Sequence, residues 1–347
     1  MSLKIGIVGL PNVGKSTLFQ ALTKREVDTS NYPFATIEPN VGVVPMPDER
    51  LIQLAKISQS EKIIPAIVEF VDIAGLVKGA NQGEGLGNQF LRHIREADAI
   101  LEVVRAFEKS DVAHVEGILN PQRDMEIIAA ELILKDLETI NNHLPKIEKE
   151  LKGAAKESAK KINRRLELFE SLKNSLSRGQ LANQCSEEEK EISQSISLLT
   201  AKPFMYIFNG GPQKTKNKEG LKNSLTLNIK EELELSALSD DERREFQTET
   251  SLDLIIKKAY EMLGLISFFT TGKKETRAWT VKRGATAKKA GAAIHSDFEE
   301  KFIKADVIFW KDLIKANGWN QARNQGLLRL EGKDYPVQDG DVMEFKI

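Results

Sequence analysis

Short apolar runs alternate with segments of helical periodicity over residues 1–125. Runs at 4–8, 67–71 and 99–104 have the length and β-branched content of buried strands, and helical stretches lie between them, as at 88–97. The same texture returns at 203–208 and 225–229. Strands that alternate with helices predict an α/β fold, with a parallel sheet covered by helices.

The segment between these α/β stretches has a different pattern. Its apolar residues recur alternately four and three positions apart, which indicates a heptad seam: Ile133, Leu137, Ile140, Leu144, Ile147 and Leu151. A turn-like, lysine-rich stretch at 153–161 precedes a second helical stripe formed by Ile162, Leu166, Phe169 and Leu176. We predict an antiparallel helical hairpin. Pro145 should kink or split its first helix, and we interpret the charges as a solvated helix face rather than a binding site.

The last part of the chain predicts a small α+β module. Strand-like runs at 279–281, 327–330 and 342–345 surround one helical segment at 286–304. The predicted organisation is a first domain over 1–127 and 203–264, a helical insertion over 128–202, and a C-terminal module over 265–347.

Composition narrows the class of protein. The chain has 347 residues, enough for two or three domains, and 29% are charged and 41% hydrophobic, as in soluble globular proteins. The net charge is −1, so no global field favours nucleic acid or membrane. Cys185 is the only cysteine, which excludes an internal disulfide. Without a signal-like start or a membrane-length apolar run, we expect a cytoplasmic protein that contacts neither membrane nor DNA.

The most informative motif follows the first predicted strand. Residues 9–16 read Gly-Leu-Pro-Asn-Val-Gly-Lys-Ser and fit the phosphate-binding pattern G-x-x-x-x-G-K-[ST]. A glycine turn that binds nothing is the alternative, but the full strand–turn–helix setting argues against it. The residues predicted to bind nucleotide here are Asn12, Val13, Gly14, Lys15, Ser16 and Thr17. Lys15 would contact the β- and γ-phosphates, and the Ser16 hydroxyl would ligate Mg²⁺.

Two further segments indicate a switch NTPase. Asp72 and Gly75 form D-x-x-G at the end of a predicted strand, where the Asp holds Mg²⁺ through water and the Gly amide faces the γ-phosphate. Thr36 lies in an extended segment between two prolines, so we prefer it to Thr29 as the switch threonine and metal ligand.

Base recognition should follow the 203–208 strand. A guanine reader would show Asn/Thr-Lys-x-Asp, but the chain has Asn209-Gly210-Gly211-Pro212. No carboxylate stands in the reading position, so the residues do not support guanine specificity.

These motifs together resemble the YchF family of P-loop NTPases, a branch related to the Obg GTPases. The resemblance rests on residues 9–17, 32–40, 44–48, 70–80, 83–91, 277–280 and 332–335. It implies a Ras-like G domain, a coiled-coil insertion and a C-terminal TGS domain with a β-grasp fold. It also implies hydrolysis of ATP in preference to GTP, and association with ribosomes. The family reads its base with N-x-x-E, and here Asn209 matches while Pro212 replaces the glutamate. The resemblance therefore implies that Asn209 contacts the base, and backbone amides near Gly210 could still read it.

The residue that orients the attacking water is less clear from the motifs. Ras-like enzymes use a Gln just after D-x-x-G, but this chain has Leu76 there. The resemblance points instead to His114, whose imidazole could orient water; a surface-loop histidine is the alternative. Asn12 resembles an asparagine that helps hold K⁺ in related switches.

A basic stretch marks a candidate RNA surface in the C-terminal module. Residues 268–289 carry seven lysines and arginines against one glutamate, with Trp279 among them. Basic side chains neutralise phosphates and an aromatic ring can stack on a base, so we predict contact with ribosomal RNA. The candidates are Lys273, Lys274, Arg277, Lys282 and Arg283. A solubilising surface around a buried tryptophan is the alternative.

Three functions therefore remain open. The first is a slow ATP-hydrolysing switch that engages the ribosome, with Mg²⁺ as cofactor and K⁺ as a further candidate. The second is a GTP-specific Obg-type GTPase with a remodelled base pocket. The third is an RNA- or ribosome-binding scaffold whose nucleotide site is structural. A small-molecule kinase is least favoured, because no lid or substrate pocket is evident.

Overall fold

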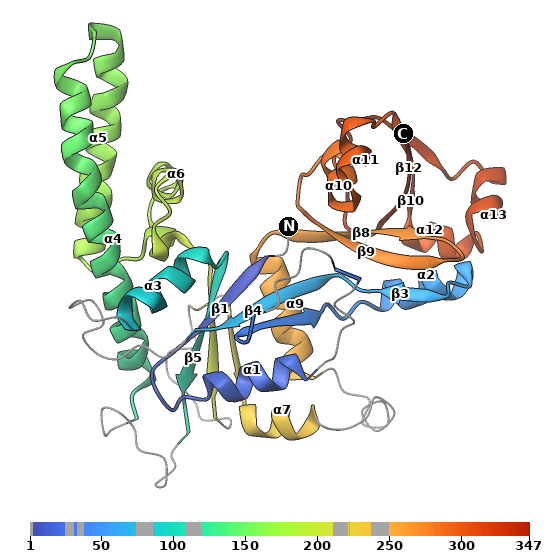
Figure 1. Cartoon of the computed structure of the whole chain (residues 1–347), viewed down its shortest axis with the longest axis horizontal. Coiled ribbons are helices and arrows are strands. Elements are labelled where there is room, and N and C mark those ends of the chain that lie inside the picture. Colours follow the sequence, from blue (N-terminus) through green and yellow to red (C-terminus); the bar gives the residue numbers. More distant parts are fainter. Residues whose placement is uncertain are drawn as a thin grey trace. The chain divides into compact units, whose positions relative to one another are not determined.

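The computed structural model describes residues 3–24, 31–32, 38–73, 86–107, 119–210, 221, 223–236 and 250–347, with only the backbone at 86–89. These residues form two compact units, each built from separate parts of the chain (Figure 1). Unit 1 comprises Met1–Leu3, Leu22–Glu69 and Ser239–Ile347, and unit 2 comprises Lys4–Ala21 and Phe70–Leu238. No helix in the described ranges is long and apolar enough to cross a bilayer.

The first sheet has six strands in the order β2-β4-β1-β5-β6-β7. Their bounds are β1 Lys4–Val8, β2 Val41–Pro45, β4 Ile67–Asp72, β5 Ala99–Arg105, β6 Phe204–Asn209 and β7 Ser224–Leu227. The pairs β1–β5, β5–β6 and β6–β7 are parallel, which confirms the predicted parallel sheet. All seven residues of β5 are buried, as expected for a strand with helices on both faces.

Helices connect these strands. Helix α1 (Lys15–Thr23) begins directly after the loop that follows β1, and α3 (Leu86–Glu96) precedes β5. Helix α7 (Ile229–Leu235) follows β7. The strand expected at 225–229 therefore ends earlier, at Leu227. The reason is local, because the Asn228 side chain accepts a hydrogen bond from Lys230 N and caps the helix.

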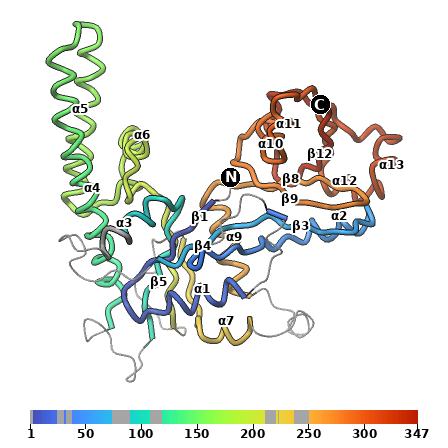
Figure 2. Tube along the Cα trace, viewed as in Figure 1, coloured from blue at the N-terminus to red at the C-terminus, as the bar shows by residue number. Residues whose placement is uncertain are grey.

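The predicted helical hairpin is present in unit 2. Helices α4 (Pro121–Lys152) and α5 (Lys156–Ser177) lie side by side and antiparallel, joined by a short connection (Figure 2). The seam forms one apolar cluster in which Ile133, Ile140, Ile147, Phe169 and Leu176 are buried. Leu137, Leu144, Ile162 and Leu166 pack against it while partly buried. The heptad interpretation is thus confirmed.

The structure corrects two local expectations about the hairpin, the split of its first helix and the extent of its turn. Helix α4 is not split at Pro145, which lies inside one continuous helix. The proline side chain is exposed, and the buried seam on both sides supports the helix despite the missing N–H. The lysine-rich turn expected at 153–161 is also shorter, because α5 already begins at Lys156.

The base of the hairpin is fixed to the chain that enters β6. Asp136 of α4 is buried and accepts hydrogen bonds from Leu199 N at 2.7 Å, Thr200 N at 2.8 Å and Thr200 Oγ1 at 2.6 Å. Leu199 and Thr200 belong to the short 3₁₀ helix Leu199–Ala201. Burial raises the pKa of Asp136, and the three bonds oppose that shift. The hairpin is thereby joined to the sheet through a satisfied buried carboxylate.

Unit 1 contains the second six-stranded sheet, in the order β11-β10-β12-β8-β9-β3. Its strands are β3 Lys62–Ile64, β8 Leu265–Thr271, β9 Glu275–Lys282, β10 Lys304–Phe309, β11 Arg329–Glu331 and β12 Asp341–Lys346. Strands β8 and β12 are parallel, whereas β8–β9, β10–β12 and β10–β11 are antiparallel. This mixed sheet with helices beside it is the expected β-grasp module.

The helical segment expected at 286–304 is two helices, α10 (Ala287–Ile294) and α11 (Ser296–Glu300). His295 is extended between them, and its Nδ1 accepts a hydrogen bond from Asp297 N at 3.2 Å. The two helices approach closely, because a Cβ on Gly291 would lie 2.8 Å from Phe298 O. Residues 304–309 form β10 rather than the end of a helix.

Strand β3 was not anticipated, and it comes from the first predicted domain. It pairs in parallel with β9, Ile63 opposite Thr276, at the edge of the second sheet. Helix α2 (Glu49–Ser58) precedes it. Arg50 of α2 forms an ion pair with Asp339 at 2.8 Å and lies 5.1 Å from the centre of the Phe269 ring. Because of these contacts, the compact units do not coincide with the three predicted segments. The predicted boundaries stay a proposal: 1–127 with 203–264, 128–202, and 265–347.

Candidate functional site

The loop between β1 and α1 has the backbone geometry of a phosphate cradle. Gly9, Asn12 and Gly14 have φ values of 154°, 62° and 108°. A Cβ on Gly9 would lie 2.5 Å from Val103 O, so only glycine fits there. Asn12 is one of the few non-glycine residues that tolerate a left-handed conformation. Successive backbone N–H groups in loops of this conformation form anion-binding concavities for phosphate oxygens.

Lys15 lies in this loop with its ammonium group buried. Its side chain is 8% exposed, and Nζ donates a hydrogen bond to Leu10 O at 2.8 Å. Burial lowers the pKa of Lys15, and the nearby Asp72 carboxylate raises it. The lysine is thus held in place by the loop itself, with a carboxylate close enough to affect its charge.

Asn209 links the loop to a neighbouring helix. Its Nδ2 donates to Val13 O at 2.8 Å, and its Oδ1 accepts from Ile229 N at 3.1 Å. A Cβ on Gly14 would lie 2.6 Å from Asn209 Nδ2. Both ends of the Asn209 amide are therefore used to hold the loop and the start of α7. In this arrangement, Asn209 positions the site rather than presenting a free amide to a base.

Gly210 also has a structural role. Its N–H donates to Leu227 O at 2.9 Å, and its φ is 152°. A Cβ there would lie 2.5 Å from Ala106 O. Its own amide is thus already hydrogen-bonded within the protein, and the residue is required to be small.

Several predicted residues lie outside the described ranges: Thr29, Thr36, Gly75, Leu76, His114 and Pro212. Of the predicted site residues that are described, the structure brings together the loop residues 12–17, Asp72 and Asn209. Gly210 follows Asn209 at the end of β6.

The donor set available for Mg²⁺ consists of oxygen atoms. Ser16 is exposed in the first turn of α1, and no described residue accepts or donates a hydrogen bond to its hydroxyl. Asp72 ends β4 and acts electrostatically on Lys15. A hydroxyl and a carboxylate are ligands that Mg²⁺ prefers, with water completing the shell. The residues present therefore fit this ion.

A buried acidic pair in the same unit was missed by the sequence analysis. Glu102 of β5 is 2% exposed, and its Oε1 has no hydrogen-bond partner in the described part of the chain. Burial and the Asp124 carboxylate raise the pKa of Glu102 well above its usual range. Tyr206 lies opposite Glu102 in the parallel register, and its pKa is also raised. The sequence does contain a signal that could have revealed this pair, because Glu102 is a charged residue inside the apolar run 99–104.

The basic stretch of the C-terminal module divides into two groups. Lys273, Lys274, Lys282 and Arg283 are exposed. Arg277 is not, because its Nη2 donates to Asn31 O at 2.6 Å and its guanidinium lies 4.3 Å from the centre of the Trp279 ring.

Trp279 is committed to packing rather than displayed for stacking on a base. Its ring lies 6.5 Å from that of Phe268, and its Nε1 donates to Thr270 Oγ1 at 2.9 Å. The structure thus favours the packing interpretation for Arg277 and Trp279, whereas the other four candidate cations are exposed and form no ion pair with any described residue.

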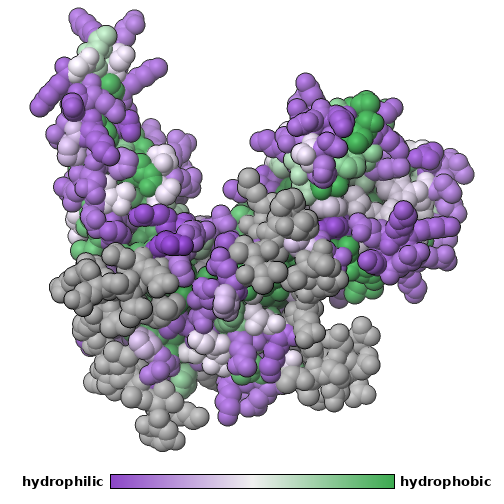
Figure 3. Space-filling model, viewed as in Figure 1, coloured by the Kyte–Doolittle hydropathy of each residue, from purple (hydrophilic) through white to green (hydrophobic). Residues whose placement is uncertain are grey.

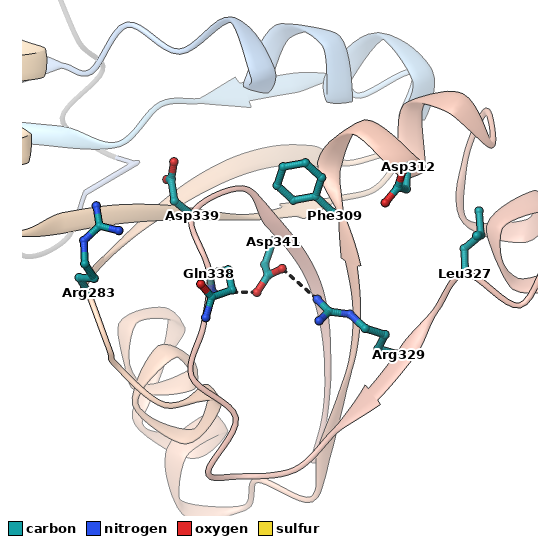
Figure 4. A pocket seen from close by; sticks show the side chains of 8 residues that line it. All are labelled: Arg283, Phe309, Asp312, Leu327, Arg329, Gln338, Asp339 and Asp341. Carbon is teal, nitrogen blue, oxygen red and sulfur yellow. Dashed lines mark hydrogen bonds and ion pairs between the residues drawn. The ribbon is translucent and has the colours of Figure 1, made fainter.

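The C-terminal module also has a pocket of about 550 Å³ (Figure 4). Buried Asp341 accepts hydrogen bonds from Gln338 N at 2.9 Å, Tyr335 Oη at 2.8 Å and Arg329 Nη2 at 3.2 Å. Phe309 contributes an apolar wall. The charges at the centre of this pocket are therefore already paired within the protein.

The phosphate loop between a buried strand and a helix, set in a parallel sheet, defines a P-loop NTPase. Residues 4–162 match a family model described as a 50S ribosome-binding GTPase, and residues 265–347 match the C-terminal YchF GTPase model, described as a protein of unknown function. The chain belongs to the YchF family, as its similarity to full-length relatives shows.

Three relatives illustrate that similarity. The "Ribosome-binding ATPase YchF" of Haemophilus influenzae is 47% identical over 100% of this chain and 99% of its own length. The Bacillus subtilis protein of the same name is 41% identical over the same shares of the two chains. The solved structure of the Schizosaccharomyces pombe YchF GTPase has a TM-score of 0.87 and 36% identity, covering 99% of this chain and 98% of that one.

Proposed function

We propose that this protein is a P-loop switch NTPase that binds ATP with Mg²⁺, hydrolyses it slowly to ADP and phosphate, and associates with the ribosome in the cytoplasm. The main support is the loop geometry, in which Asn12 and Gly14 at positive φ surround a buried Lys15. The names of the relatives support the ATPase activity and the ribosome as partner.

Each predicted site residue would have its own role in binding Mg²⁺·ATP. Amides of 12–17 bind phosphate oxygens, and the Lys15 ammonium moves from Leu10 O toward the β- and γ-phosphates. Ser16, Thr36 and, through water, Asp72 would hold Mg²⁺, which neutralises charge on those phosphates. The Gly75 amide would face the γ-phosphate. Binding and electrostatic positioning account for most of the catalysis in this class.

The choice of ATP over GTP rests on the relatives' names and on the missing guanine reader. No Asp stands three residues after Asn209, and the Asn209 amide is already hydrogen-bonded to Val13 O and Ile229 N. Titration calorimetry with ADP and GDP tests this. At least tenfold tighter binding of ADP is expected. Tighter binding of GDP would favour the Obg-type alternative, which one matching family model also suggests.

The resemblance to the YchF family assigns water orientation to His114; Leu76, just after D-x-x-G, cannot hydrogen-bond water. His114→Ala should lower single-turnover hydrolysis at least tenfold while ATP affinity stays within twofold. Unchanged turnover would remove His114 from the mechanism. A potassium ion at Asn12 would make the rate higher in K⁺ than in Na⁺, and equal rates would exclude it.

Charge along the helical hairpin supports a polyanionic partner. Residues 146–165, around the tip, hold eight lysines and arginines against three glutamates, a net charge of +5. The base of the hairpin, residues 121–138 and 166–177, holds three basic and seven acidic residues, a net charge of −4. Hydrophilic side chains dominate this end in Figure 3. A merely solvated face would not need such segregation, so we propose a binding role for these charges in place of the solvated face expected from the sequence.

The tip lysines are available to a partner. Lys146, Lys149, Lys152, Lys156, Lys160 and Lys161 make no ion pair with any described residue. Arg164 and Arg165 instead pair with Glu188 and Glu150. Phosphates of ribosomal RNA fit such a surface, together with the exposed Lys273, Lys274, Lys282 and Arg283.

Co-sedimentation with ribosomes at several salt concentrations tests the hairpin tip and the C-terminal surface separately. Replacing the six tip lysines by Gln should weaken binding and flatten its salt dependence, because fewer counterions are released. The same change at Lys273, Lys274, Lys282 and Arg283 tests the C-terminal surface. Lys135→Gln, at the acidic base, is the control. Binding that is unaffected by either set would contradict RNA contact through these cations.

A scaffold with a purely structural nucleotide remains the alternative from another class. It predicts no release of phosphate, even with ribosomes present. Steady-state phosphate release above that of a Lys15→Ala variant would exclude it.

A further inference from the structure

The pocket of the C-terminal module is built at one end of the second sheet, entirely within unit 1 (Figure 4). Phe309 lies opposite Asp341 in the β10–β12 register, and Val307 lies opposite Arg329 in the β10–β11 register. Because opposite residues, and residues two apart in one strand, share a face of the sheet, Phe309, Arg329 and Asp341 stand on the same face. The other lining residues come from loops and from α12 (Trp310–Lys315): Arg283, Asp312, Leu327, Gln338 and Asp339.

Two of the three carboxylates that line the pocket are already paired within unit 1. Asp341 accepts a hydrogen bond from Arg329 Nη2 at 3.2 Å. Asp339 accepts from Ser267 N at 3.0 Å and forms an ion pair with Arg50 at 2.8 Å. A further charge brought against these pairs would lose its hydration without gaining a partner, so the inner part of the pocket fits a neutral polar group better than an anion.

Arg283 supplies a charge that is available to a ligand. It is exposed, one residue beyond the end of β9, and forms no ion pair with any described residue. A guanidinium binds the oxygens of a phosphate group in pairs. The three carboxylates elsewhere in the lining repel an anion, so a phosphate group fits beside Arg283 and not further inside.

Phe309 gives the pocket a flat apolar wall. Its side chain is 37% exposed at the end of β10. Gly340, with φ 95°, lets the ring pack against the backbone, since a Cβ there would lie 2.9 Å from Phe309 Cε2. Leu327, 40% exposed, adds a second apolar surface. A ring held in this way offers a surface on which a nucleobase can stack at small entropic cost.

These features together match the parts of a single RNA nucleotide. We propose that the pocket binds one unstacked base of single-stranded RNA, stacked on Phe309, with the adjoining phosphate on Arg283. The pocket volume of about 550 Å³ lies within the range of small-ligand sites, roughly 300–1,000 Å³. This inference rests on the proposed function, because it gives the RNA partner a specific contact in the C-terminal module.

Asp312 makes the pocket selective among bases. It lies in the first turn of α12 and pairs loosely with Lys315 of the same helix, at 3.9 Å. Its half-exposed carboxylate accepts a hydrogen bond from an exocyclic amino group, as acidic side chains do from cytosine. Uracil has no such group, so the pocket should prefer cytidine to uridine.

The test measures binding of two fluorescently labelled RNA hexamers, hexacytidine and hexauridine, to the full-length protein by fluorescence anisotropy. Both carry the same charge, so the lysines at the hairpin tip contribute equally to each. Wild type should bind hexacytidine at least fivefold more tightly. Phe309→Leu keeps an apolar side chain against Gly340 but loses the stacking surface, so it should weaken hexacytidine binding about fivefold or more.

Three further variants separate the roles of the other residues. Asp312→Ala should bring the two hexamers to within twofold of each other. Arg283→Gln should weaken both by the same factor, at least threefold, because it removes only the phosphate contact. Lys333→Gln, an exposed cation of the same module that does not line the pocket, is the matched control and should change neither affinity by more than twofold. Arg283 and Asp312 are exposed or half-exposed, so their variants decide the matter if Phe309→Leu does not fold.

Equal binding of the two hexamers by wild type would overturn the proposal, as would wild-type affinity in Phe309→Leu. Displacement of hexacytidine by a hexaglutamate peptide of equal concentration would assign the pocket to an acidic protein segment, and would also overturn it. Failure of the wild type to co-sediment with ribosomes would instead overturn the proposed function, whatever the hexamers show.

Discussion

At the residue scale, Glu102 is notable because it places a carboxyl group in the middle of a strand that is buried throughout. Its Oε1 has no hydrogen-bond partner among the described residues, and Asp124 adds a second acid. Leaving such a group ionised costs several kcal/mol, roughly, so the native protein holds its proton more tightly than the unfolded chain does.

This predicts that stability falls as pH rises. The pKa of Glu102 is raised by burial, so the native state carries an extra proton above the unfolded value of about 4.3. Stability is greatest below that value and is lost as pH rises toward the folded pKa. Glu102→Gln should flatten this decline, measured by urea unfolding at a series of pH values upward from the unfolded pKa. Glu148→Gln, on the exposed hairpin surface, should not; a slope that survives in Glu102→Gln would assign the proton elsewhere.

Asn209 gives a second test at this scale. Asn209→Asp keeps an acceptor for Ile229 N but has no N–H for Val13 O, whereas Asn209→Ala loses both bonds. Each lost bond leaves a buried polar group unpaired, at about 1–3 kcal/mol. We expect ATP affinity to fall about tenfold in the Asp variant and further in the Ala variant, as measured by calorimetry. Asn142→Ala is the exposed control, and wild-type affinity in both Asn209 variants would refute the linking role.

At the element scale, Pro145 is the clearest conflict between local preference and packing. A proline inside a helix removes one hydrogen bond and costs about 3 kcal/mol. Helix α4 nevertheless continues through it, because Ile140 and Ile147 are buried on either side. The hairpin is therefore less stable than its seam would allow.

Pro145→Ala should restore the bond to the carbonyl of Asn141 and stabilise the protein by about 1–3 kcal/mol. The side chain is exposed, so no packing is lost. Urea unfolding followed by far-UV circular dichroism measures the change, with Lys146→Ala as the neighbouring control. A decrease in stability would indicate that the proline has a packing role of its own.

Helices and strands whose apolar residues recur with a strong period could be predicted from the sequence. Elements that depend on a partner far away in the sequence could not. The heptad seam and the runs at 4–8 and 99–104 correctly predicted α4–α5, β1 and β5. Strand β3 has three residues and exists because β9 offers it an edge, a partner more than 200 positions away. In the site, the motif identified Lys15, but only tertiary structure shows that Asn209 is used to hold the loop.

At the scale of the whole molecule, the second sheet depends on a segment from early in the chain. Strand β3 covers the edge of β9, and Ser60 Oγ lies 2.7 Å from Thr276 Oγ1. Arg50 adds its ion pair to Asp339. The C-terminal module is therefore completed by residues that precede it by two hundred positions.

A fragment of residues 265–347 should consequently be less stable and should self-associate, because β9 becomes an open edge. Sedimentation velocity over a concentration series measures association. Thr276→Lys in the fragment is the matched variant and should suppress it by placing a charge at the edge. A monomeric, fully stable fragment would show that β3 and α2 contribute little.

The division of both units between early and late chain segments has a consequence for synthesis. Helix α2 and strand β3 are translated some 200 residues before β9, an interval of roughly 10–40 s at typical elongation rates. During that time Ile64, which is buried in the folded protein, and the apolar side of α2 have no sheet to join. A chain that terminates before residue 265 keeps this segment without its partner, so premature termination yields a product whose uncovered surface marks it for chaperones and proteases.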